Sequence, residues 1–363
     1  MKKALYILAS LAIVACSKSE ATYENNESML AIMPVSHHAS KAAIIDNEFP
    51  QTNHISLFAY HNPRVTAGTV SNYTGFANNV YLYDAEFYYN ASSPTDIGGT
   101  IAWSGLNSIY YWPITGSVVF AGYSLPAPTA TEPTSSPRIG TASYDLMSDV
   151  LKINGYVQSN STASTFDLLY FGRDGKSYNN RREGTAVPVE FNHALAWITI
   201  KVKGGAGALV TGHEWYITDL TLKNVNTKGD FTFNGTPEAE KNEVLLKWDL
   251  STDVAPMVVF DEADGQKLTN TYEVIENVDY GTVVIPQTPK MLSVTLTYKS
   301  QANDDIEENF DIDLSLGEGV IWEAGKRYVY NIEFSPTEIK VAPKVTVWPS
   351  TGQEGYVETD KTM

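Results

Sequence analysis

Short runs of alternating apolar and polar residues are the main pattern along the chain. In residues 197–203, the apolar side chains of Ile198, Ile200 and Val202 alternate with polar ones. A period of two residues is typical of a β-strand with one buried and one solvated face. The same period recurs in residues 55–59, 291–299, 310–314 and 328–334. The pattern therefore predicts an all-β protein.

Segments rich in glycine, proline and polar residues separate these runs at short intervals. They occur at residues 203–207, 227–230, 286–289 and 323–326. Many short strands with frequent turns favour β-sandwich domains. Residues 172–186 are polar and have no apolar period, so we interpret them as a linker. We therefore expect one sandwich domain over residues 42–171 and a second over residues 187–363.

The N-terminus has the layout of a bacterial lipoprotein signal. Lys2 and Lys3 precede an apolar run over residues 4–14, which is too short to span a bilayer. The small residue Ala15 then stands directly before Cys16, the only cysteine in the chain. This arrangement predicts a signal peptide over residues 1–15 and lipidation of Cys16, for example with palmitate. The alternative is an ordinary signal peptide that happens to contain a cysteine.

Composition excludes several classes of function. Removing residues 1–15 takes two lysines from 25 basic residues, which leaves 23 against 42 acidic residues and a formal charge of −19. Such an acidic surface repels nucleic acid and anionic lipid headgroups. Without a second cysteine, the chain has neither an intramolecular disulfide nor a thiolate metal site. Stability outside the cytoplasm must therefore come from burial.

Motifs for catalysis or metal binding are absent from the sequence. The acidic residues 303–308 lack the alternating oxygen ligands and the central glycine of a calcium loop. Residues 204–207 lack the continuation of a phosphate-binding loop, and no G-x-S-x-G motif occurs. The histidines lack the helical spacing of a metalloprotease site; they are His37, His38, His54, His61, His193 and His213. We therefore expect no enzyme activity, no cofactor and no metal.

Six segments in order resemble the fimbrillin family, the type V pilins of Bacteroidales. They are F-P-x-x-x-x-I-x-x-F-A-Y at 49–60, Y-W-P at 111–113 with F-A-G-Y at 120–123, D-L-L-Y at 167–170, F-x-H-A-L at 191–195, residues 220–229, and residues 322–330. The resemblance implies two tandem transthyretin-like β-sandwich domains. It also implies export as a lipoprotein and assembly into a surface fibre.

In that family, a trypsin-like protease removes the first strand after a basic residue, and a strand from a neighbouring subunit fills the groove. Residues 29–35 fit the removable strand, with Leu30 and Ile32 on one face. Lys41 is the only lysine or arginine between this strand and the Phe49-Pro50 motif. The resemblance therefore predicts cleavage between Lys41 and Ala42, although most relatives have arginine there. The alternative is that no cleavage occurs.

The resemblance places the donor strand at the C-terminal end, within residues 338–348. Two short alternating stretches flank Pro343 there, and the candidate groove-filling residues are Ile339, Val341, Val345 and Val347. Both stretches could equally be closing strands of the second domain, because a closing strand needs the same alternation.

Together these features predict a structural subunit of a cell-surface fimbrium that supports adhesion. Its expected partners are other pilin subunits in a homopolymer or mixed fibre, the lipoprotein export machinery, a trypsin-like protease, and the outer membrane through the lipid of the precursor. The alternative is a surface lipoprotein that does not polymerise, either a pilus anchor or a glycan-binding adhesin. The candidate glycan-binding aromatics are Trp103, Tyr110, Tyr111 and Trp112.

Overall fold

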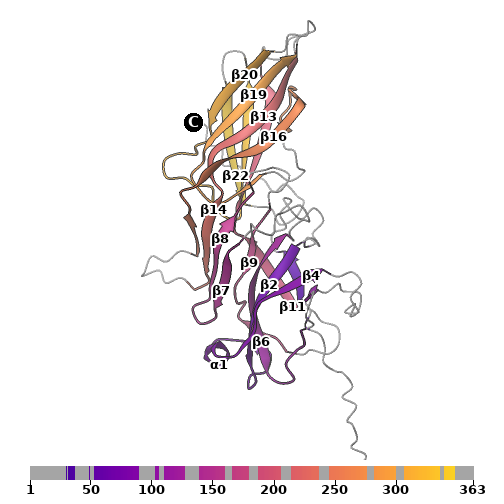
Figure 1. The fold of residues 1–363 in the computed structure, drawn as a ribbon, viewed down its shortest axis with the longest axis vertical. Helices are drawn as coiled ribbons and strands as arrows, with labels where there is room; N and C mark the ends of the chain where they lie inside the picture. Colours follow the sequence, from indigo (N-terminus) through magenta and orange to yellow (C-terminus); the bar gives the residue numbers. More distant parts are fainter. Residues whose placement is uncertain are drawn as a thin grey trace, which may run out of the picture.

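The computed structural model confirms the all-β prediction. It describes residues 30, 32–36, 49, 53–89, 103–105, 110–126, 139–159, 166–179, 187–205, 214–236, 245–275, 282–299, 306–335 and 339–347. The sheets follow one another along an elongated molecule (Figure 1). A single short helix, α1 (Thr74–Ala77), interrupts the strands of this described part.

Strands from residues 32–193 form a closed, hydrogen-bonded sheet. In order around the sheet they are β1 (Ile32–Ser36), β11 (Val187–His193), β9 (Leu169–Phe171), β6 (Ser117–Pro126), β2 (Asn53–Asn62), β4 (Val80–Tyr89) and β5 (Trp103–Gly105). The short strands β3 (Gly68–Thr69) and β10 (Lys176–Ser177) pair beside it. The sheet closes because β1 joins β11 on one side and β5 on the other.

Two sheets pack face to face at the other end of the molecule (Figure 1). One contains β17 (Glu273–Val274), β12 (Ala196–Gly204), β21 (Lys326–Phe334) and β22 (Ile339–Val347), with β18 (Thr282–Val284) also on β12. The other contains β16 (Val254–Lys267), β13 (Glu214–Asn226), β19 (Met291–Lys299) and β20 (Ile306–Asp313). A shared core that includes Ile200, Leu220, Val294 and Tyr330 fills the space between them.

A further sheet joins the two halves of the sequence. Its order is β15 (Leu246–Leu250), β14 (Lys228–Asn234), β8 (Val150–Val157) and β7 (Thr141–Asp145). Because β14 pairs with β8, strands on either side of the predicted linker share one sheet. The described part of that linker, residues 172–179, contains β10. The division into domains at residues 42–171 and 187–363 stays a prediction.

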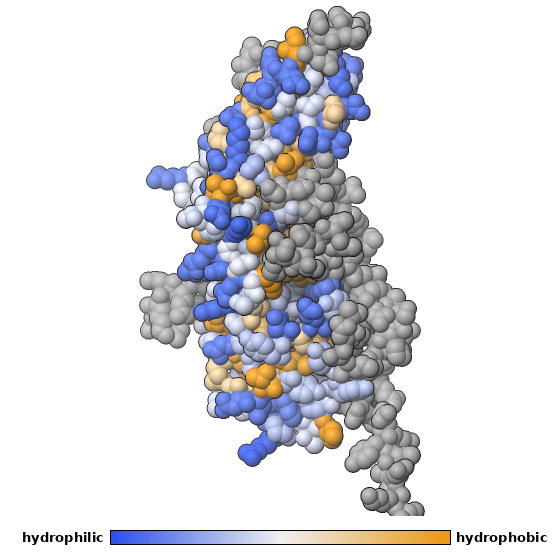
Figure 2. All heavy atoms as spheres, in the orientation of Figure 1, coloured by the Kyte–Doolittle hydropathy of each residue, from blue (hydrophilic) through white to orange (hydrophobic). Residues whose placement is uncertain are grey.

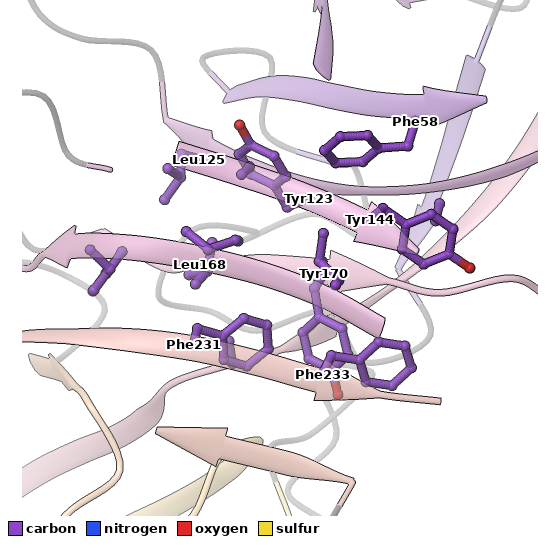
Figure 3. Packing of buried hydrophobic residues seen from close by; sticks show 14 of the residues in the cluster. Phe58, Tyr123, Leu125, Tyr144, Leu168, Tyr170, Phe231 and Phe233 are labelled. Carbon is purple, nitrogen blue, oxygen red and sulfur yellow. The ribbon is translucent and has the colours of Figure 1, made fainter. Parts of the chain in front are cut away.

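Aromatic side chains fill the space between this joining sheet and the closed sheet. Phe231 and Phe233 of β14 face Tyr170 of β9, with ring centroids 5.2 and 4.9 Å apart (Figure 3). Phe58 of β2 and Tyr123 of β6 lie in the same core. The joining sheet is therefore attached by burial of large apolar surface, the dominant favourable term in folding.

The structure corrects two details of the sequence analysis. Residues 197–203 do form β12, but the face predicted to be solvated is buried at Trp197 and Thr199. The Arg327 guanidinium lies 3.9 Å from the centre of the Trp197 ring and its Nε donates to the Thr199 hydroxyl at 3.2 Å, so this face packs against protein. The break predicted at residues 227–230 is shorter than expected, because only Thr227 separates β13 from β14, which begins at Lys228.

The visible surface of the described residues is mostly hydrophilic, with apolar residues scattered across it (Figure 2). Edge strands of the two face-to-face sheets include β20, which carries acidic side chains such as Glu307 and Glu308. Charged side chains on edge strands oppose unwanted pairing with other chains. Part of the negative charge of the chain therefore lies on edge strands, where it opposes pairing with other chains.

Candidate functional site

The first described strand, β1, occupies a slot in the closed sheet. It runs parallel to β11 from the pair Ile32–Val187 to the pair Ser36–Phe191. On its other side, Ile32 pairs with Trp103 of β5, and the Leu30 N–H donates to the Tyr110 carbonyl at 2.7 Å. The predicted removable strand is thus an integral strand of the closed sheet.

The side chains of Leu30 and Ile32 are 1% and 0% exposed. Both lie in a core of residues from every long strand of the closed sheet, including Ile55, Phe87 and Phe120. The sequence prediction that these two side chains share a face is therefore confirmed by their burial in one core. Removing β1 would leave a hydrophobic groove along the inside of this sheet.

Strand β11 forms the long wall of the slot. Its residues alternate between buried and exposed positions, with Val187, Val189 and Phe191 facing the core. The Phe191 ring lies 5.0 Å from the Phe49 ring and 5.0 Å from the Phe171 ring, centroid to centroid. These aromatic contacts, from Phe171 of β9 and from Phe49 outside the strands, hold β11 in place without β1. The wall is therefore supported independently of the strand that occupies the slot.

The predicted donor segment forms one continuous strand, β22, rather than two stretches around Pro343. It pairs antiparallel with β21 from Ile339–Phe334 to Val347–Lys326. Ile339, Val341 and Val345 are only partly buried against the second core. Within the described residues no strand lies on the outer side of β22. In this structure the segment is an edge strand of its own chain, and its role as a donor strand stays a prediction.

A buried His–Asp pair sits at the end of β11. His193 Nδ1 contacts Asp167 Oδ2, and both residues are almost fully buried. Burial raises the pKa of the Asp167 carboxyl, and the nearby histidine opposes this shift. The next residue, Ala194, donates its N–H to the Leu168 carbonyl at 2.9 Å. The pair thus fastens the base of β11 to the segment that leads into β9.

Sequence reasoning missed this contact. His193 belongs to the F-x-H-A-L motif and Asp167 to the D-L-L-Y motif, 26 residues apart. The available signal was one charged or titratable residue within each otherwise largely apolar motif. Nothing in either motif identifies the other as its partner, because only the pairing of β11 with β9 brings them together.

Three of the aromatic residues considered for glycan binding, Tyr110, Tyr111 and Trp112, do not form one exposed surface; the side chain of the fourth, Trp103, lies outside the described part of the chain. Trp112 is buried, and its ring meets the Phe120 ring edge-on at 6.0 Å. Tyr110 stacks on Phe87 at 5.3 Å and packs against the core of the closed sheet. Tyr111 is partly exposed, and its carbonyl accepts a hydrogen bond from the Tyr81 hydroxyl. Core packing therefore accounts for Tyr110 and Trp112.

The processing and lipidation residues Cys16, Lys41 and Ala42 lie outside the described residues. Searching the described ranges finds no group of three or more His, Cys, Asp or Glu side chains able to hold a metal ion. In the same ranges, no helix has the length and apolar character needed to cross a membrane.

Comparison with known proteins identifies the family. A family model described as fimbrillin-like matches residues 40–348. A solved fimbrial protein from Bacteroides vulgatus is 14% identical and has a TM-score of 0.47, over 88% of this chain and 99% of the other. The C-terminally truncated tip fimbrial protein Mfa3 from Porphyromonas gingivalis is 9% identical with a TM-score of 0.34, over 87% and 99%.

No curated protein matches the chain. The family assignment therefore depends on the family model, which spans most of the sequence. Fimbrillins are structural and adhesive proteins rather than enzymes. This chain belongs to the fimbrillin-like family and is a pilus-type, cell-surface adhesion subunit without catalytic activity.

Proposed function

We propose that the chain is a polymerising structural subunit of an outer-membrane fimbrium. The export machinery delivers it as a lipoprotein acylated on Cys16, and a trypsin-like protease cuts between Lys41 and Ala42. The first strand then leaves with its lipid, and a C-terminal strand from another pilin subunit takes its place.

The burial of Leu30 and Ile32 in the slot of β1 is the observation that supports this proposal. A chain that lost β1 would expose the backbone of β11 and the core-facing side chains Val187 and Val189. Both an unpaired strand edge and a hydrophobic groove favour addition of a strand from another chain. Polymerisation restores the buried core that cleavage removes.

Lys41 lies between β1 and Phe49, the next described residue. Cleavage there would separate β1 from the rest of the closed sheet without cutting β2, which contributes Ile55 and Leu57 to the core. Cleavage at Arg64, the next basic residue, would detach β2 as well. The position of Lys41 thus suits release of a single strand.

The N-terminal residue of protein recovered from the cell surface tests this function. The proposal expects Ala42 at the N-terminus of fibre subunits and acylated Cys16 only on precursor. Acylated Cys16 on every surface molecule would refute processing and favour a lipid-bound anchor or a glycan-binding lipoprotein. A glycan array with the purified, uncut monomer would then separate those two alternatives.

A further inference from the structure

The first strand and the last described strand share a pattern of three alternate residues. Leu30, Ile32 and Pro34 stand at every second position of the first, and Ile339, Val341 and Pro343 do so in β22. Each strand therefore presents two aliphatic side chains followed by a proline on one face. Proline is rare inside sheets because it cannot donate to the hydrogen-bond ladder. The equivalent places of Pro34 and Pro343 therefore indicate how the two strands can be aligned.

In β1, the nitrogen of Pro34 lies on the side of the strand that makes no hydrogen bonds to β11. The Leu30 N–H points away from β11, since it donates to the Tyr110 carbonyl. Backbone N–H groups along a strand alternate between its two sides, so the Pro34 nitrogen also points away from β11. The parallel pairing with β11 continues past Pro34 to Ser36. A proline at this position therefore removes no hydrogen bond to the wall.

Strand β22 also tolerates its proline within continuous pairing. Pro343 lies opposite Tyr330, and the β21–β22 register runs from one end to the other without a shift. Proline in an edge strand is placed with its nitrogen toward the open side. β22 can therefore form hydrogen bonds along one edge over its whole length, as pairing with β11 in the groove would need.

We propose that β22 of a second copy enters the groove in the same direction as β1, with Ile339, Val341 and Pro343 in the positions of Leu30, Ile32 and Pro34. This inference rests on the proposed function and specifies its register. Val345 then takes the place of Ser36 of β1, opposite the buried Phe191. Ile339 and Val341, which are partly buried in their own sheet, take the places of Leu30 and Ile32, which are 1% and 0% exposed.

Charge supports the same register. In the groove, the place of Val35 of β1 lies opposite Glu190, an exposed residue of β11. Lys344 occupies that position in the proposed register, so opposite charges face each other on the outer surface. Such cross-strand pairs stabilise a sheet modestly. In β1 the residue paired with Glu190 is Val35, which carries no charge.

Other registers are disfavoured. A shift of one residue would direct Lys340 and Lys344 into the hydrophobic groove, because it moves every side chain to the other face. A shift of two residues in either direction puts Thr346 or Ala342 beside Glu190 and removes the charge pair. One of these shifts also places Pro343 where Ile32 stands in β1. The backbone N–H at that place points toward β5, and proline cannot supply it. The matched proline and Lys344 therefore define a single register.

Cysteine cross-linking tests the register directly. Cys16→Ser removes the only thiol of the chain, and a site for a sequence-specific protease placed after residue 41 makes release of β1 inducible. Glu190→Cys is then combined with Lys344→Cys, or with Ala342→Cys or Thr346→Cys as register controls. Directly opposed cysteines lie within disulfide reach, whereas a displacement of two residues along a strand exceeds it.

After cleavage and oxidation, the Lys344→Cys pair is expected to give a ladder of linked subunits on a non-reducing gel. Uncut protein and both control pairs should give at least tenfold less. A stronger ladder from either control pair, or polymers that form without any ladder, would overturn the register while leaving polymerisation intact. Absence of polymers by size-exclusion chromatography would refute the proposed function, and the register with it.

Discussion

Truncating Ile32 should destabilise the precursor but not the processed subunit. Ile32 is 0% exposed and pairs with Val187 on one side and Trp103 on the other. Replacing such a buried aliphatic residue with alanine typically costs about 2–5 kcal/mol, from the lost transfer free energy and the cavity left behind. Because β11 is also held by Phe49 and Phe171, the site has little freedom to collapse, and we expect about 3 kcal/mol or more.

Urea unfolding of the uncut Cys16→Ser chain, followed by circular dichroism, measures this loss. With a slope of about 3 kcal/mol per molar urea, Ile32→Ala should lower the midpoint of the transition of the closed sheet by about 1 M. Val80→Ala is the matched control, since Val80 belongs to the same sheet but is 56% exposed. Its midpoint should change by less than about 0.3 M, because exposed substitutions rarely exceed 0.5 kcal/mol.

The same variant distinguishes a removable strand from a permanent one. Once residues 1–41 are cleaved and lost, Ile32→Ala and wild-type subunits are identical, so their polymers should have the same midpoint. A midpoint shift below about 0.3 M in the uncut chain would refute the argument from burial. A difference that persists in the polymer would show that β1 stays in the slot.

Three further predictions concern processing, the buried pair and one turn. Lys41→Gln should abolish processing and leave acylated precursor on the surface, whereas Lys41→Arg should be cut normally, as mass spectrometry of the N-terminus would show. His193→Ala should cost about 3–5 kcal/mol of unfolding free energy, because it leaves a buried carboxylate unpaired. Asp167→Asn should cost only about 1 kcal/mol, since a neutral amide still accepts from the imidazole and burial already raises the pKa of the acid; equal costs in urea unfolding would contradict this reasoning. Gly116→Ala should lower the melting temperature measurably, because Gly116 has φ of +83° and an added Cβ would lie 2.1 Å from the Asn62 carbonyl oxygen; an unchanged melting temperature would show that this turn adjusts freely.

The sequence determined several strands and the face of each that is buried. Residues 291–299 are predicted and observed as one strand, β19, in which the alternating apolar residues Leu292, Val294 and Leu296 are buried. Alternation failed at Trp197 and Thr199, where the second face of β12 packs against Arg327. A period of two residues identifies a strand, but it cannot show what covers the polar face.

The sequence also placed Leu30 and Ile32 on one face of a strand near the N-terminus, and local periodicity was sufficient for that. Only the tertiary structure decided that this strand closes a sheet between β11 and β5, and that β14 pairs with β8 across the predicted linker. It likewise brought Asp167 to His193 and held β22 in its own sheet. Local patterns depend on which side chains can be buried together on one strand, whereas strand partners depend on long-range pairing that neighbouring residues do not encode.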